Sequence, residues 1–261
     1  MVWKVLAVAV QAAVAALSLT LASAIVPAIA QDNLGQRLSM DRLAAIQPGA
    51  YLAGDTVKFI LAPYNGDFLM RLQDSPEIFV LYADNASLGG RVLKYDSGDV
   101  AMRVAVWGGI TLYTDQQPGG LPVVRVGDSP PPSPPMMGPG EMTNIMQVEV
   151  QRLVAARQLH IAFNIDWNAF GSPLARSYAF NAVQNAARGI ERFAVSAVGH
   201  ELLSRRIDNV VVQPTGGHPD FALNGKTLVV LFNSSRGFAG CASSRDLAEW
   251  FAETFGQAPR R

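Results

Sequence analysis

Six of the twelve residues from Ser129 to Gly140 are proline, which makes this run the strongest single constraint on how the chain folds. Each proline removes a backbone N–H donor and fixes φ near −65°, so neither a helix nor a sheet continues through the run. A segment of this composition favours an extended polyproline II path of roughly 3 Å per residue. The run at 129–140 is therefore predicted to link two folding units, at 57–128 and 141–261.

The first thirty residues have the pattern of a secretory signal peptide. Lys4 is their only charged residue, Val5–Val26 is almost entirely apolar, and alanines at positions 28 and 30 precede the polar Gln31. These features predict a signal peptide at 1–30 that is cleaved after Ala30, with a cut at residues 22–24 as the alternative. Because the apolar run is long enough to approach a membrane-spanning helix, an uncleaved anchor is the other interpretation.

The composition of the remaining chain restricts its function. Removal of residues 1–30 takes one of the 21 basic residues and none of the 21 acidic ones, which leaves a net charge of −1. Phosphate contacts require a basic surplus, so no nucleic acid is expected as a partner. No later stretch approaches about 18 uninterrupted apolar residues, so no transmembrane segment is expected in the mature chain.

The half of the chain before the prolines has the pattern of short strands. Residues 31–56 are a polar leader with one short helix at Ser39–Ile46, which Pro48 and Gly49 would end. Period-two segments then follow at 57–128, and Asn65–Gly66 is a strong signal for a tight turn. The segments are Val57–Leu61, Phe68–Leu72, Glu77–Tyr82, Arg91–Tyr95, Val100–Val106 and Ile110–Thr114, with Pro122–Val126 as an edge strand. They predict a small antiparallel β meander, rolled into a barrel or sandwich.

A set of turn and strand residues lies in the same half, at Phe68–Leu72, Ser75–Glu77, Leu81, Arg103 and Gly108–Thr114. With these residues, the chain from Phe59 to Pro118 resembles a small secreted family of alphaproteobacteria known as a domain of unknown function. The resemblance implies a Gram-negative, periplasmic setting. It implies no activity, cofactor or catalytic residue.

The half after the prolines mixes helical and extended patterns. The expected helices are Glu141–Arg157, Leu174–Ser204, which Gly189 or Gly199 would bend or end, and one that opens at the capping-box sequence Ser243–Asp246. The expected strands are Gln158–Ile165, Val210–Val212, Phe221–Leu223 and Thr227–Phe232. This order predicts an α+β layered unit with the helices on one face of the sheet, and hence an α+β fold class for the whole chain.

Cys241 is the only cysteine, so an exported chain cannot close an internal disulfide with it. It precedes the last expected helix, whose dipole could lower the pKa of the thiol and make it a nucleophile. The alternative is that Cys241 is a small packing residue.

Three further residues are candidates for chemistry. Asp166 follows an expected strand, His218 lies in a glycine-rich loop, and Ser235 follows a strand but lacks the first glycine of a nucleophile elbow. The histidines at 160, 200 and 218 do not have the spacing of metal ligands, so no metal site is expected. No glycine-rich phosphate loop is present, and no cofactor is expected.

Two functions remain open from the sequence. The first is a non-catalytic binding or envelope-associated module, periplasmic or secreted, whose partner is an envelope protein or polymer. The alternative is a periplasmic hydrolase with a site around Asp166, His218, Ser235 or Cys241. The identity of any binding residues is not indicated.

Overall fold

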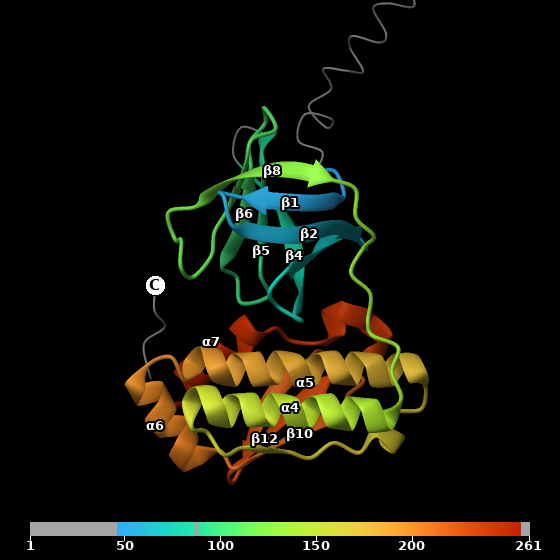
Figure 1. Cartoon of the computed structure of the whole chain (residues 1–261), viewed down its shortest axis with the longest axis vertical. Helices are drawn as coiled ribbons and strands as arrows, with labels where there is room; N and C mark the ends of the chain where they lie inside the picture. The colour runs from blue at the N-terminus through green and yellow to red at the C-terminus, as the bar shows by residue number, and fades with distance from the viewer. Residues whose placement is uncertain (1–45, 87–88, 257–261) are drawn as a thin grey trace, which may run out of the picture. The chain divides into compact units, whose positions relative to one another are not determined.

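The computed structural model describes residues 46–86 and 89–256. The predicted signal peptide at 1–30, and the leader as far as residue 45 with most of its expected helix, lie outside these residues. Within them the protein has an α+β fold, in which an antiparallel barrel is followed by helices packed on a mixed sheet (Figure 1). The predicted fold class is confirmed.

The first part is a closed barrel in which each strand pairs with the next and the last returns to the first. The strands are β1 Gly49–Ala53, β2 Val57–Tyr64, β3 Asp67–Leu72, β4 Ile78–Asn85, β5 Arg91–Lys94, β6 Val100–Val104, β7 Ile110–Leu112 and β8 Leu121–Gly127. All their pairings are antiparallel. The expected turn at Asn65–Gly66 joins β2 to β3, with φ of 51° and 93° at its two residues, as a two-residue hairpin loop requires.

Strand β1 corrects the expectation that residues 49–53 belong to the leader. Residues 49–53 read Gly-Ala-Tyr-Leu-Ala and show no alternation of polar with apolar side chains, and Pro48–Gly49 pointed instead to the end of a helix. In the structure Gly49 has a φ of +150°, and an added Cβ would lie 2.3 Å from the carbonyl oxygen of Gly127. Only glycine therefore fits where β1 meets β8. Because β1 pairs with both β2 and β8, it leaves the barrel without a free edge.

Side chains fill the inside of the barrel, so it is a packed core. Tyr51 stacks on Phe59 with ring centroids 5.3 Å apart, and Phe79 meets the ring of Tyr95 edge-on at 5.1 Å. The other members of this buried cluster are Ala53, Leu61, Phe68, Met70, Leu81, Leu93, Ala101, Met102 and Leu112. Eight strands give an interior just wide enough for such side chains.

The second part is a sheet covered by helices on one face. Its elements are α4 Pro139–Arg157, β9 Ala162–Phe163, the 3-10 helix η2 Trp167–Ala169, α5 Pro173–Phe193, α6 Ala197–Arg206, β10 Asn209–Pro214, β11 Asp220–Asn224, β12 Thr227–Phe232, the 3-10 helix η3 Ser234–Gly240 and α7 Ser244–Thr254. The strand order is β11-β12-β10-β9, with β9 and β12 parallel to β10 and β11 antiparallel to β12. Alternate residues Val210, Leu228, Val230 and Phe232 join the buried faces of α4, α5 and α7 in one core.

Two elements differ from the sequence-based expectation. The segment 158–165 has the predicted alternation, with Leu159, Ile161 and Phe163 buried, but only Ala162–Phe163 pairs with β10 as strand β9. The expected helix Leu174–Ser204 is two helices, α5 and α6. Neither expected glycine lies at the break, which falls at residues 194–196.

Ser196 explains the restart after this break, because its side chain caps α6 by accepting a hydrogen bond from the backbone N–H of Gly199 at 2.9 Å. Gly189 and Gly199 have another role: each lies so close to a neighbouring residue that a side chain would not fit. An added Cβ at Gly199 would lie 2.2 Å from the carbonyl oxygen of Phe193, and one at Gly189 would lie 2.8 Å from Leu247 of α7. Helix α4 also begins two residues before its predicted start, with Pro139 in the first turn, where proline fits.

The barrel contacts the helical layer directly. Phe238 of η3 is buried against Leu69, Ile78 and Val80 on the outer side of β3 and β4. Its backbone N–H donates to the hydroxyl of Tyr64, 3.1 Å away. Ile46–Arg261 accordingly form one compact unit, and the division into separate folding units at 129–140 stays a prediction. Across residues 46–86 and 89–256, no helix combines the length and apolar character needed to cross a bilayer.

Candidate functional site

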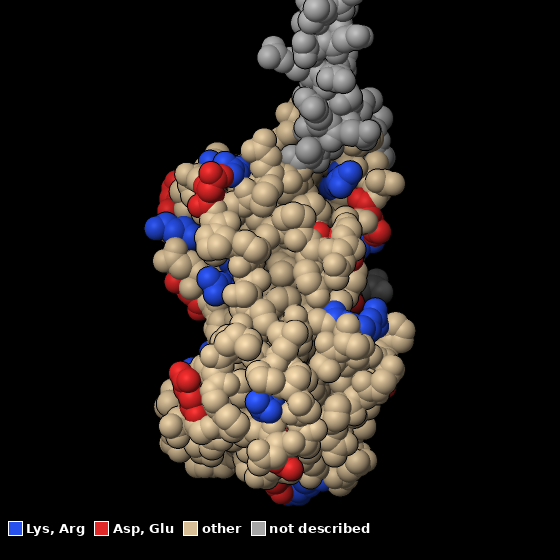
Figure 2. Space-filling model, turned by 90° about the vertical axis from the view of Figure 1, so that its right-hand side faces the viewer, with Lys and Arg blue, Asp and Glu red and all other residues tan. Residues whose placement is uncertain are grey.

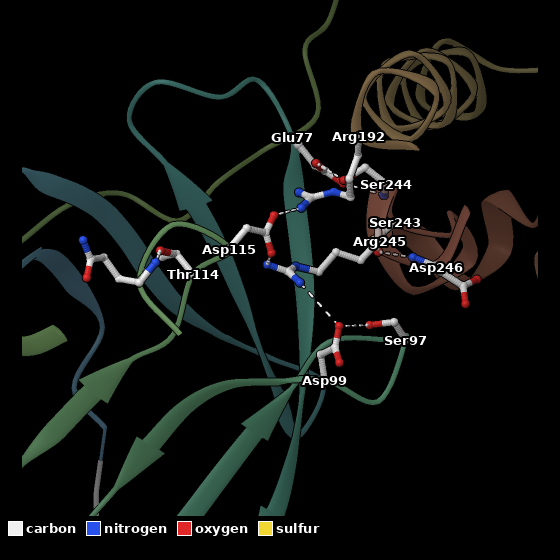
Figure 3. Close-up of polar contacts among 11 residues, drawn as sticks. Glu77, Ser97, Asp99, Thr114, Asp115, Arg192, Ser243, Ser244, Arg245 and Asp246 are labelled. Carbon is white, nitrogen blue, oxygen red and sulfur yellow. Dashed lines mark hydrogen bonds and ion pairs between the residues drawn. The ribbon is translucent and has the colours of Figure 1, made fainter. Parts of the chain in front are cut away.

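The N-terminus of α7 is bound by two carboxylates that come from the barrel. Asp96, in the β5–β6 connection, accepts hydrogen bonds from the backbone N–H of Ser243 at 2.7 Å and from its hydroxyl. Glu77, just before β4, accepts from the backbone N–H and the hydroxyl of Ser244, both at 2.7 Å. The first N–H groups of a helix have no partner within the helix and carry partial positive charge, so carboxylates stabilise them. These bonds fix α7 on the barrel, and Figure 3 shows Glu77 beside Ser244.

Glu77 is almost completely buried, with 2% of its surface exposed. Burial raises the pKa of its carboxyl to about 7, against the opposing effects of the Ser244 hydrogen bonds and of the Arg192 charge. Burial also raises the pKa of Asp96, and the Ser243 hydrogen bonds oppose it. Both carboxyls therefore hold protons more tightly in the folded protein than in the unfolded chain.

Two arginines of the helical layer meet one carboxylate of the barrel beside these contacts. Asp115, in the β7–β8 connection, forms ion pairs with Arg192 at the end of α5 and with Arg245 in the first turn of α7. Arg245 lies 2.6 Å from Asp115, reaches Asp99 at 3.4 Å, and holds its guanidinium 4.2 Å above the centre of the Tyr95 ring. Burial and the nearby charge of Arg245 lower the pKa of Arg192. Figure 3 shows the two guanidinium groups converging on Asp115.

A cavity of about 350 Å³ opens at this end of the barrel. Successive strands alternate in direction, so the connections β1–β2, β3–β4, β5–β6 and β7–β8 all lie at one end, and each contributes to the wall. The lining residues are Thr56, Val57, Lys58, Leu72, Gln73, Asp74, Ser75, Phe79, Tyr95, Thr114, Asp115, Gln116, Arg192 and Arg245. We call this space the mouth cavity. Its volume lies within the usual range of small-molecule sites, roughly 300–1,000 Å³.

A second cavity, of about 330 Å³, lies on the other side of the α7 N-terminus and is acidic. Its lining includes Asp220, Asp246, Glu249 and Glu253 together with Trp250. Burial and the neighbouring carboxylates raise the pKa of Asp246 to about 6. Across the described part of the chain, no group of three His, Cys, Asp or Glu side chains is arranged to hold a metal ion.

Cys241 does not have the environment of a nucleophile. It is buried, with 6% of its surface exposed, and its Sγ donates to the carbonyl oxygen of Tyr178 at 3.3 Å. Burial raises the pKa of its thiol to about 12. Since only the thiolate is nucleophilic, the packing interpretation fits the structure.

The side chains of the other three candidate residues, Asp166, His218 and Ser235, each contact a different neighbour. Asp166 caps η2 through the N–H of Asn168 at 3.0 Å. The loop of His218 lies beside η3, and the His218 ring contacts the side chain of Arg236 in that helix. The Ser235 hydroxyl instead donates to Asn233, 2.6 Å away. Within residues 46–86 and 89–256, no hydrogen bond joins any two of residues 166, 218, 235 and 241. The remaining histidines are separate, with His160 exposed and His200 hydrogen-bonded to the carbonyl oxygen of Arg157.

The residues of the mouth cavity were not found from the sequence. One signal was present: Ser243 caps the last helix as predicted, accepting from the backbone N–H groups of Arg245 and Asp246. The barrel residues that contact the start of this helix, however, lie far from it in the sequence. Glu77 and Ser244 are 167 residues apart, and Arg245 and Asp115 are 130 apart. No local pattern relates residues at such separations.

Comparison with known proteins gives a family and no further relative. No curated protein and no solved structure matches the chain. A family model described as a domain of unknown function (DUF4908) matches residues 31–251, well beyond the Phe59–Pro118 range that carries the resemblance in the sequence. The expected membership in a family of unknown function is confirmed. The chain belongs to the DUF4908 family, a domain of unknown function.

Proposed function

We propose that this protein is an exported periplasmic binding module that takes a small ligand in the mouth cavity and carries out no catalysis. The observation that carries the proposal is the cavity of about 350 Å³ into which Arg192 and Arg245 project at the end of a packed barrel. Rigid strands and two helix ends support its wall, and a few charged groups converge in it. Concave sites with few convergent polar groups are typical of ligand binding.

Export is supported by the first thirty residues, whose single charge, apolar run and small-residue junction suit a signal peptide. The family model begins at residue 31, where the predicted mature chain also begins. The alphaproteobacterial resemblance supports the periplasm as the location, and an envelope protein or polymer stays the predicted partner class. A secreted location is the alternative.

A binding role is supported by the state of the residues that a hydrolase would need. The Cys241 thiol is buried, and the Ser235 hydroxyl is occupied by Asn233 instead of by a base. On the face in Figure 2, Lys and Arg side chains are scattered among acidic and uncharged ones. A face that mixes the two signs of charge in this way does not favour a polyanion such as nucleic acid.

The experiment is a thermal-shift panel on residues 31–261 with citrate, succinate, inorganic phosphate, glucose, glucose 6-phosphate and arginine. Thr56 lines the mouth cavity and is exposed, so Thr56→Trp should block it with little effect on folding. Asp55→Trp, in the same turn but outside the lining, is the matched control. We expect a stabilising compound for the wild type and for Asp55→Trp, and none for Thr56→Trp. Equal shifts in all three proteins, or no shift in any, would contradict the proposal.

A further inference from the structure

Asp115 is more exposed than the two arginines with which it forms ion pairs. About half of its side chain is exposed, at 49%, whereas Arg245 and Arg192 are 13% and 29% exposed. Asp115 lies in the connection between β7 and β8, whose residues 113–120 belong to no helix or strand. The arginines, in contrast, project from the ends of helices α5 and α7.

Arg245 has supporting contacts that do not involve Asp115, whereas for Arg192 it is helix α5 that fixes the position of the backbone. Arg245 stacks over Tyr95 and sits in a helix turn whose N-terminus is bonded to Glu77 and Asp96. Arg192 belongs to the last turn of α5, which packs along α7. The Nε atoms of both arginines are buried and have no hydrogen-bond partner within residues 46–86 and 89–256. Their donors are therefore only partly used, although a buried unpaired donor is costly.

We propose that Asp115 is a displaceable substitute for an oxyanion group of the ligand, and that a carboxylate or phosphate takes its place between Arg192 and Arg245. This inference rests on the proposed binding function of the mouth cavity. Guanidinium groups pair with carboxylates and phosphates through two parallel hydrogen bonds, and such charge-assisted bonds are stronger than neutral ones. Asp115 already shows that the space between the arginines accommodates a carboxylate.

The charge of the lining supports this ligand class. With Asp115 in place, the cavity wall carries three cations, Lys58, Arg192 and Arg245, and two anions, Asp74 and Asp115. With Asp115 turned away, three cations of the wall face one anion of the wall, and Asp99, outside the lining, still pairs with Arg245, so the cations remain in excess. Displacement therefore leaves a net positive site that an entering anion neutralises.

The test measures binding of inorganic phosphate and of succinate, by isothermal titration at constant ionic strength, to the wild type and its variants. Asp115→Asn removes the competing charge, so it should bind at least one of the two anions about tenfold or more tightly than the wild type, a change of about 1.4 kcal/mol. Tighter binding of phosphate alone assigns a phosphate-bearing ligand, and of succinate alone a carboxylate-bearing one. Arg245→Gln should lose the binding.

Asp84→Asn is the matched control. Asp84 is a barrel carboxylate that is 57% exposed and paired with Lys94 outside the cavity lining, so its loss should leave the affinity unchanged. Asp115→Ser provides a second neutral variant if Asp115→Asn does not fold. Binding of panel compounds with no gain in either Asp115 variant would overturn the displacement and leave the binding function standing. An equal gain in affinity for Asp84→Asn would also overturn the displacement, because the gain would then come from the change in net charge. If no compound binds to the wild type or to any variant, both the displacement of Asp115 and the proposed binding function are overturned.

Discussion

Replacement of Glu77 by glutamine should stabilise the protein above neutral pH and have little effect at acidic pH. Burial raises the pKa of this carboxyl from its ordinary value of 4.5 to about 7. Between these values the unfolded chain releases the proton and the folded protein keeps it, so the free energy of unfolding falls as the pH rises. Each tenfold change in proton affinity is worth about 1.4 kcal/mol, which gives about 3 kcal/mol over the whole window.

Glutamine resembles the protonated carboxyl in shape and cannot ionise, so Glu77→Gln should not lose this free energy. Urea unfolding at about pH 4.5, 6 and 8 should show equal stability at the lowest pH, and at the highest a variant more stable by up to about 3 kcal/mol. Asp96 and Asp246 also have raised pKa values and contribute with the same sign, so the difference between the two proteins isolates Glu77. The exposed Glu201, as Glu201→Gln, is the matched control and should follow the wild type. A Glu77→Gln variant less stable than the wild type at about pH 8 would refute the reasoning, because the Ser244 hydrogen bonds would then outweigh burial.

Three other predictions concern the rest of the chain. Cys241, with a thiol pKa raised to about 12 by burial, should react with iodoacetamide at pH 7 far more slowly in the native protein than in urea; equal rates would place the thiol on the surface. Proteolysis should cut near the 129–140 run and leave two fragments that co-elute on gel filtration. Phe238→Ala should weaken the association of the fragments, because Phe238 is buried against β3 and β4. Scattered cuts through both halves would instead mean one interdependent domain. Mass spectrometry of protein from the envelope fraction should find Gln31 at the N-terminus, and an intact Met1 in membranes would contradict cleavage.

Local signals account for the parts of the fold that could be predicted. Asn65–Gly66 is a turn because both residues tolerate positive φ, and Ser243 caps α7 because its oxygen reaches nearby N–H groups. The alternation of apolar and polar residues located the strands from Val57 onward. In each case the cause lies within a few residues of the effect, so the sequence alone carries it.

Features that depend on distant partners could not be predicted. Gly49 begins a strand because Gly127 lies against it, and Gly189 lies within α5 because Leu247 of α7 packs against it. The mouth cavity requires the ends of four barrel connections and two helices to meet. Arg192 in particular has no sequence signal, since it is one charged residue in the last turn of a long helix.

A crystal structure of the protein with the most stabilising compound of the panel would test the central claim most directly. We expect electron density for the compound in the mouth cavity, with its oxyanion group between Arg192 and Arg245 and with Asp115 turned away. Density for the compound at another surface, with the Asp115 ion pairs intact and the cavity unoccupied by it, would contradict the account.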